Sequence, residues 1–338
     1  MLLDSWSLAL TLGSLIVIFL VATATRTGVR VLRHWNPSSD GQQQIRLESE
    51  IWLSSTLVAY ALGIQILSLV LLVLAADEFA GMIKGAMCAT GSLLANGFGM
   101  PALLVKLAGV FFYGFWLLLH HLDIQSESYP LVRGKFLFLL ALLPLLGADV
   151  ALQTLYLFNL TPDIITSCCA VVFSPESGSG PNLLAGWSET ALLSFFYSSA
   201  VILAGLGGWL LFNGRQGQRS MAKLLYSLAW LCFLGLALVV ITTAVSSYVY
   251  AMPFHRCPFC ILKPQYGYIG FALYGSLLAA AFFGITVWPA GWFSDRPGLS
   301  AAVAGYQRLA CRTSLFLLFC FIGLASFHWL RYFFAGGE

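Results

Sequence analysis

Charged residues are scarce in this sequence. Asp, Glu, Lys and Arg make up 9% of its 338 residues, whereas soluble domains carry roughly 25%. A soluble fold of this length could not cover its surface with so few charges, so lipid is the natural solvent. Runs of Lys and Arg are absent too, which argues against nucleic acid as a partner.

The N-terminus lacks the positively charged segment that begins a cleaved signal peptide. The chain starts Met-Leu-Leu-Asp, and the apolar run from Trp6 to Ala24 follows directly. A membrane helix needs about 20 apolar residues, and this run is long enough to span. We therefore predict that it is retained as the first membrane helix.

Hydrophobic residues make up 59% of the chain and are concentrated in long runs. These runs are too long and too uniformly apolar for barrel strands, and only helices and closed barrels satisfy their backbone in lipid. The sequence predicts an all-α fold, a polytopic bundle of about eight transmembrane helices in a single domain, 1–338. The seven later runs are Ile51–Ala75, Pro101–Leu119, Phe136–Phe158, Glu189–Phe212, Leu224–Tyr248, Tyr268–Trp288 and Ser314–Phe334.

The basic residues predict the orientation of the bundle. Twelve of the 17 lie in alternate connections, and cytoplasmic loops carry the excess of Lys and Arg. These are Arg26, Arg30, Arg33, Arg46, Arg133, Lys135, Arg215, Arg219, Lys223, Arg296, Arg308 and Arg312. We expect both termini outside, with outer loops near 79–100, 159–188 and 249–267. The bias suits a bacterial inner membrane, with these loops in the periplasm.

The three outer loops hold five of the eight cysteines, and these five are the predicted catalytic residues: Cys88, Cys168, Cys169, Cys257 and Cys260. Cys257-Pro258-Phe259-Cys260 is the sharpest motif, because this spacing closes a redox disulfide or offers two thiolates to a metal. His255 and Arg256 precede it, and nearby positive charge lowers a thiol pKa. We expect Cys257 to attack and Cys260 to resolve; a static structural disulfide is the alternative.

The other outer cysteines, Cys88, Cys168 and Cys169, are each consistent with more than one role. Cys168 and Cys169 are adjacent, which suits an exchanging pair, a soft-metal site or bonds to two distant partners. Five outer cysteines leave one unpaired if two disulfides form, and Cys88, which lies in a glycine-rich stretch, is the candidate for that thiol. An unpaired thiol here is either reactive or a metal ligand. In the metal interpretation, a copper, zinc or mercury ion is held by Cys168, Cys169, Cys257, Cys260 and His255.

Two ionisable residues fall inside apolar runs, where such residues are functional candidates. Lys106 lies about five residues from the outer end of its run and Asp149 about nine, a difference of about 6 Å at 1.5 Å per residue. We predict an intramembrane ion pair between them. The alternative is a lysine that reaches the interface and a protonated aspartate.

The cysteine arrangement resembles membrane thiol–disulfide oxidoreductases of the disulfide-bond-formation protein B and vitamin K epoxide reductase type. In those families a membrane helical bundle carries one Cys-x-x-Cys pair at a helix end and further cysteines in an extramembrane loop. Electrons pass between the pairs, and a quinone accepts or supplies them. The resemblance covers the motifs and not the length; it implies that Cys257–Cys260 is the helix-end pair and Cys168–Cys169 the loop pair.

Three functions follow as expectations. The first is a membrane redox protein, a possible thiol–disulfide oxidoreductase whose outer partner is a periplasmic thioredoxin-like protein. The second is a soft-metal binding or transport protein that uses the same thiols. The third is a structural subunit of a larger membrane complex, in which disulfides stiffen the outer loops. Thiol state and metal content separate the three.

Overall fold

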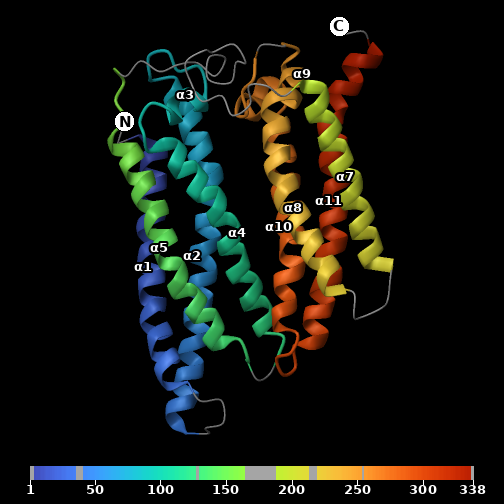
Figure 1. Ribbon diagram of the computed structural model, residues 1–338. Coiled ribbons are helices and arrows are strands. Elements are labelled where there is room, and N and C mark those ends of the chain that lie inside the picture. The colour runs from blue at the N-terminus through green and yellow to red at the C-terminus, as the bar shows by residue number, and fades with distance from the viewer. Residues whose placement is uncertain are drawn as a thin grey trace. The chain divides into compact units, whose positions relative to one another are not determined.

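The computed structural model describes residues 4–35, 41–126, 129–163, 188–212, 219–252 and 255–335. Within these ranges every regular element is a helix, and eight helices are long and apolar enough to cross a membrane (Figure 1). The all-α, polytopic membrane fold is therefore confirmed. The described helices fall into two compact units, each with its own internal contacts.

The first unit is a ring of four helices: α1 (Ser5–His34), α2 (Gln42–Ala80), α4 (Gly99–Asp123) and α5 (Val132–Phe158). α1 packs against α2 and α5, and α4 packs against the same two helices, so the ring is closed. Large buried side chains such as Tyr113, Trp116 and Phe136 fill its centre.

The second unit is built from α7 (Glu189–Phe212), α8 (Arg219–Val240), α9 (Ser246–Tyr250), α10 (Ile269–Ala290) and α11 (Ser300–Ala335) from Val303 onward. Residues 85–91 also belong to this unit, and they include the start of the short helix α3 (Ala89–Leu93). α8 packs between α7 and α10. Phe196 of α7, Phe233 of α8 and Phe321 of α11 form an aromatic cluster that joins those three helices.

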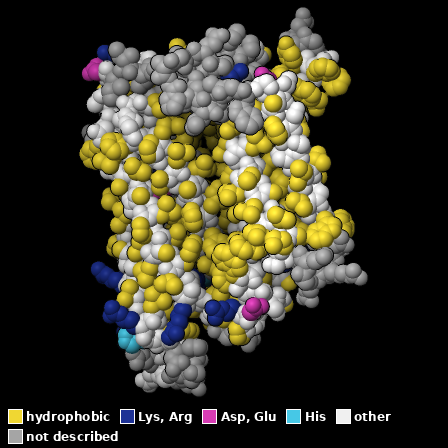
Figure 2. Space-filling model, in the orientation of Figure 1, with side chains coloured by type: hydrophobic (Ala, Val, Ile, Leu, Met, Phe, Trp, Pro, Cys, Tyr) yellow, Lys and Arg dark blue, Asp and Glu magenta, His cyan; other side chains and the backbone are white. Residues whose placement is uncertain are grey.

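The outer faces of the helices are as apolar as a membrane protein requires. Large hydrophobic side chains such as Phe19, Leu67 and Phe316 are about two-thirds exposed. Figure 2 shows hydrophobic side chains along the flanks of the helices and Lys and Arg side chains gathered near helix ends. This separation is expected when the middle of each helix lies in lipid and its ends lie in the interface.

Several helices run further than the apolar runs that predicted them. α1 continues past Ala24 to His34, and α11 begins at Ser300, well before Ser314. The expected boundaries were therefore too short, because apolarity marks only the part of a helix that lies in lipid. Beyond it the helix continues with polar side chains, and Arg30 of α1 forms an ion pair with Glu50 of α2 at 2.6 Å.

The chain changes its helical geometry just before the motif of two cysteines. α8 passes into a π-helical turn, Ile241–Val245, which leads into α9. Such turns are rare and occur often at functional sites. α9 then ends at Ala251, whose φ of 53° is left-handed and stops the helix. These two features set the direction in which the chain enters the segment between α9 and α10.

Candidate functional site

The segment between α9 and α10 holds Cys257 and Cys260 in a compact arrangement. Two short 3-10 helices, Cys260–Leu262 and Pro264–Tyr266, follow the motif. Gly267 and Tyr268 both have positive φ and turn the chain into α10. Cys260 therefore begins a turn of helix, and Cys257 lies in the irregular segment just before it.

Hydrogen bonds and close packing hold this segment against its neighbouring helices. The Tyr250 hydroxyl donates to the Cys257 carbonyl at 2.5 Å, and the Tyr274 hydroxyl donates to the Pro258 carbonyl at 2.8 Å. Gly270 of α10 lies so close to Ile261 that an added Cβ would be 2.8 Å from Ile261 Cγ1. Both ends of the two-cysteine motif are thus positioned by contacts with α9 and α10.

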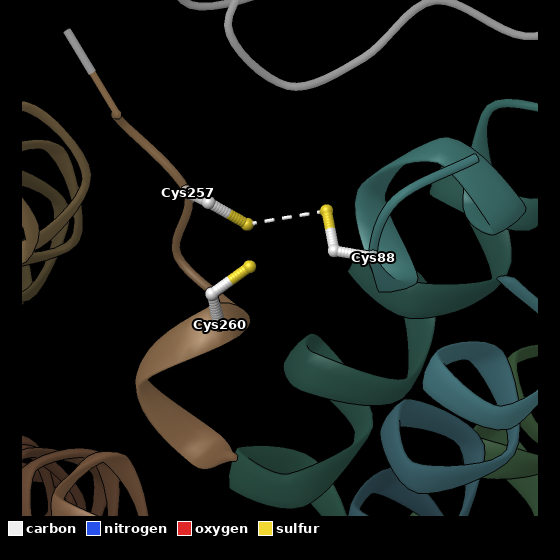
Figure 3. Close-up of side chains that lie close together, drawn as sticks. All are labelled: Cys88, Cys257 and Cys260. Carbon is white, nitrogen blue, oxygen red and sulfur yellow. Dashed lines mark hydrogen bonds between the residues drawn. The ribbon is translucent and has the colours of Figure 1, made fainter. Parts of the chain in front are cut away.

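A third cysteine, far away in sequence, completes the site. Cys88 lies just before α3, and its Sγ is 3.3 Å from Cys257 Sγ. Thr90 Oγ1 lies 3.5 Å from the same sulfur. All three cysteine sulfurs lie within 4.8 Å of one another, and Figure 3 shows them pointing toward a common centre. We call Cys88, Cys257 and Cys260 the thiol cluster.

The thiol cluster is buried. Cys257 is 0% exposed, Cys88 1% and Cys260 7%. The pKa of Cys260 is raised well above the ordinary value for a thiol, first by hydrogen bonding to Cys257 and Cys88 and then by burial. Cys260 therefore holds its proton more strongly than an isolated thiol.

The remaining predicted site residues have different positions. Cys168 and Cys169 lie outside the described residues. His255 is not part of the thiol cluster; its ring packs edge-to-face on Tyr250, with 4.6 Å between ring centroids. The proposed effect of His255 and Arg256 on the Cys257 pKa stays a prediction. The tight three-cysteine grouping could not be read from spacing, because 169 positions separate Cys88 from Cys257.

The intramembrane ion pair lies in the first unit. Lys106 Nζ is 2.9 Å from Asp149 Oδ1, and both side chains are fully buried. The lysine also donates to Ser68 Oγ at 2.8 Å. Asp149 Oδ2 accepts from Gln65 Nε2 at 2.6 Å and from Tyr113 Oη at 3.2 Å. The predicted pair is therefore present within a polar network that links α2, α4 and α5.

A second buried ion pair was not predicted from the sequence. Lys135 Nζ donates to Asp123 Oδ2 at 2.8 Å, and the two side chains are 2% and 0% exposed. Lys135 stood in the sequence as one of the basic residues of a cytoplasmic connection. The available signal was its position directly before one apolar run, twelve residues after Asp123, which lies just beyond the end of the preceding run.

No protein-family model, curated protein or solved structure matches this chain.

Proposed function

We propose that this chain is a membrane redox protein that exchanges disulfides through the thiol cluster. The observation that carries the proposal is the 3.3 Å approach of Cys88 Sγ to Cys257 Sγ, beside Cys260 in a Cys-x-x-Cys motif. Disulfide exchange requires one sulfur to attack another from close contact. Three convergent thiols always leave one free sulfur when the other two are bonded.

The exchange step within the cluster is balanced. A Cys88 thiolate attacks Cys257 Sγ of a Cys257–Cys260 disulfide, and a Cys88–Cys257 bond forms as the Cys257–Cys260 bond breaks. The electron pair leaves on Cys260, which then takes up a proton. No net electrons move in this step.

Net transfer needs two further partners, which we propose by class. A periplasmic thioredoxin-like dithiol would give two electrons and two protons to the disulfide, and a membrane quinone would accept them as quinol; the reverse direction is equally balanced. Because the thiol cluster is buried, a protein partner would not reach it directly. We propose that Cys168 and Cys169 exchange with the partner and pass electrons to the cluster.

The first experiment maps the thiols. The full chain is purified without reductant, free thiols are blocked, and disulfides are identified by mass spectrometry before and after mild reduction. We expect one labile disulfide among the three cysteines, and Cys260→Ser should accumulate the Cys88–Cys257 bond. Cys232→Ser is the matched control, because Cys232 is exposed and outside the cluster. Three thiols that stay free in air would contradict the proposal.

A soft-metal site is the second candidate, supported by the mutual approach of three buried sulfurs. In a tetrahedral zinc–thiolate site with bonds of about 2.3 Å, sulfurs lie about 3.8 Å apart. In the cluster, Cys88 Sγ and Cys257 Sγ are 3.3 Å apart and no two sulfurs are more than 4.8 Å apart, so small shifts would bring all three to that spacing. Metal analysis of the same purified sample separates the two functions. Metal bound in a fixed ratio to the protein, and lost in Cys88→Ser, would favour the metal site over the redox function.

Replacing the outer cysteines tests the third alternative, a structural subunit of a membrane complex. If all five outer cysteines were replaced by serine and the assembly remained active, the disulfides would be structural or dispensable.

A further inference from the structure

Thr90 brings a hydroxyl group to the thiol cluster, and the proposed exchange between the three cysteines does not use it. The residue lies two positions after Cys88, in the short helix α3. Cys88 Sγ is 3.3 Å from Cys257 Sγ, and Thr90 Oγ1 is 3.5 Å from the same sulfur. One short segment of the chain therefore contacts Cys257 Sγ with both a thiol and a hydroxyl.

The Thr90 hydroxyl depends on Cys257 for its hydrogen bond. Thr90 is 0% exposed, so its hydroxyl does not reach bulk water. Buried threonines such as Thr243 and Thr286 bond a carbonyl of the preceding helical turn. Thr90 is the second residue of α3, so no helical carbonyl precedes it, and in the described part of the chain its side chain bonds Cys257 Sγ alone.

The strength of this hydrogen bond depends on the oxidation state of Cys257. A thiolate sulfur accepts strongly, because hydrogen bonds to charged acceptors are roughly twice as strong as neutral ones. A thiol sulfur can accept from the hydroxyl or donate to it. The sulfur of a disulfide has neither a charge nor a hydrogen. The Thr90–Cys257 contact therefore stabilises the reduced cluster more than the oxidised one.

We propose that Thr90 is a positioning residue whose hydrogen bond to Cys257 Sγ stabilises the reduced thiol cluster and raises its reduction potential. This inference rests on the proposed redox function. Cys257 belongs to both disulfides of the exchange step, Cys257–Cys260 and Cys88–Cys257, so the same hydroxyl acts on either of them. A disulfide whose reduced form is stabilised is a stronger oxidant.

The test measures the redox equilibrium of Cys257 in the full chain. The purified protein is equilibrated in detergent, at fixed pH, with mixtures of reduced and oxidised dithiothreitol, starting from both the reduced and the oxidised protein. Dithiothreitol gives two electrons and two protons to the protein disulfide, which becomes two thiols, and closes its own cyclic disulfide. Free thiols are then blocked, and mass spectrometry gives the fraction of Cys257 that is disulfide-bonded.

Thr90→Val removes the hydroxyl and keeps the shape of the side chain. The ratio of reduced to oxidised dithiothreitol that reduces half of Cys257 should rise about tenfold, the effect of one lost hydrogen bond. For a two-electron couple this is a potential lower by about 30 mV. Thr90→Ser keeps the hydroxyl and should stay close to the native value. Thr286→Val is the matched control, because that buried hydroxyl bonds Tyr306 at the other end of α10.

The outcomes separate failure of this inference from failure of the redox function. If Cys257 of the native chain were a free thiol at every ratio, both would fail. If it were oxidised and reduced reversibly but Thr90→Val kept the native midpoint, or Thr90→Ser shifted as far, only the role of Thr90 would be overturned. Should Thr90→Val not fold, Thr90→Ala and Thr90→Ser form a second pair. Both lose the methyl group and only alanine loses the hydroxyl, so equal midpoints would again overturn the role.

Discussion

At the scale of single residues, this protein buries ionisable groups inside membrane helices, where removing a charge from water costs a large free energy of desolvation. Lys106 and Asp149 are both fully buried, and each has a second hydrogen-bonding neighbour. Desolvation of two charges is repaid only when geometry and additional hydrogen bonds are good. Such a pair therefore contributes little net stability while it is intact, yet the loss of one partner leaves an uncompensated charge.

This asymmetry predicts how the pair responds to substitution. Asp149→Leu alone should lower the free energy of unfolding by about 3–5 kcal/mol, because Lys106 then remains buried and unpaired. Lys106→Met together with Asp149→Leu should recover most of that loss. Thermal and denaturant unfolding in detergent measure both. If the double variant were no more stable than Asp149→Leu, the aspartate would be neutral and the pair absent.

The control is the exposed ion pair between Arg30 and Glu50 in the same unit. Arg30→Gln breaks the ion pair with Glu50, whose two side chains are 55% and 27% exposed. Water screens such a pair, so its loss should change stability by only about 0–1 kcal/mol.

At the scale of elements, the short helical turn that begins at Cys260 depends on close packing with α10. Gly270 occupies the first turn of α10, and a Cβ there would meet Ile261 Cγ1 at 2.8 Å and Ile261 O at 2.9 Å. The backbone oxygen cannot move without moving the turn. Since Ile261 follows Cys260 directly, any displacement is transmitted to the thiol cluster.

Gly270→Ala should therefore disturb the cluster although it removes no cysteine. We expect a loss of about 1–3 kcal/mol from overpacking and a several-fold lower yield of the Cys88–Cys257 disulfide in the Cys260→Ser background. Oxidation followed by mass spectrometry measures the yield. Gly275→Ala on the same helix has open space around it and should change neither quantity. Identical behaviour of the two alanine variants would remove Gly270 from this role.

At the scale of the whole molecule, the alternation of basic residues predicts the orientation in the membrane. An alkaline phosphatase fused after Glu338 should be active, because that enzyme folds in the periplasm and the C-terminus is expected there. A green fluorescent protein inserted at 213–218, beside Arg219 and Lys223, should be fluorescent in the cytoplasm. The reverse pattern would place the thiol cluster on the cytoplasmic side and contradict the proposed periplasmic partner.

The sequence by itself determined the fold class and the approximate helices. Eight apolar runs match the eight membrane-length helices found in the described part of the chain, because lipid forces each apolar run to satisfy its own backbone hydrogen bonds. It also predicted the ion pair of Lys106 and Asp149, since depth in the bilayer follows from residue counts along a helix. Helix ends were less accurate, because polar residues continue a helix without any apolar signal.

Only the tertiary structure decided which residues meet. The contact of Cys88 with Cys257 joins two segments distant along the chain, and the Lys135–Asp123 pair joins the start of α5 to the end of α4. Periodicity and spacing report the environment of a residue along its own helix, but not which helix face lies opposite. That choice is made by side-chain packing between helices, so the thiol cluster could emerge only from the folded chain.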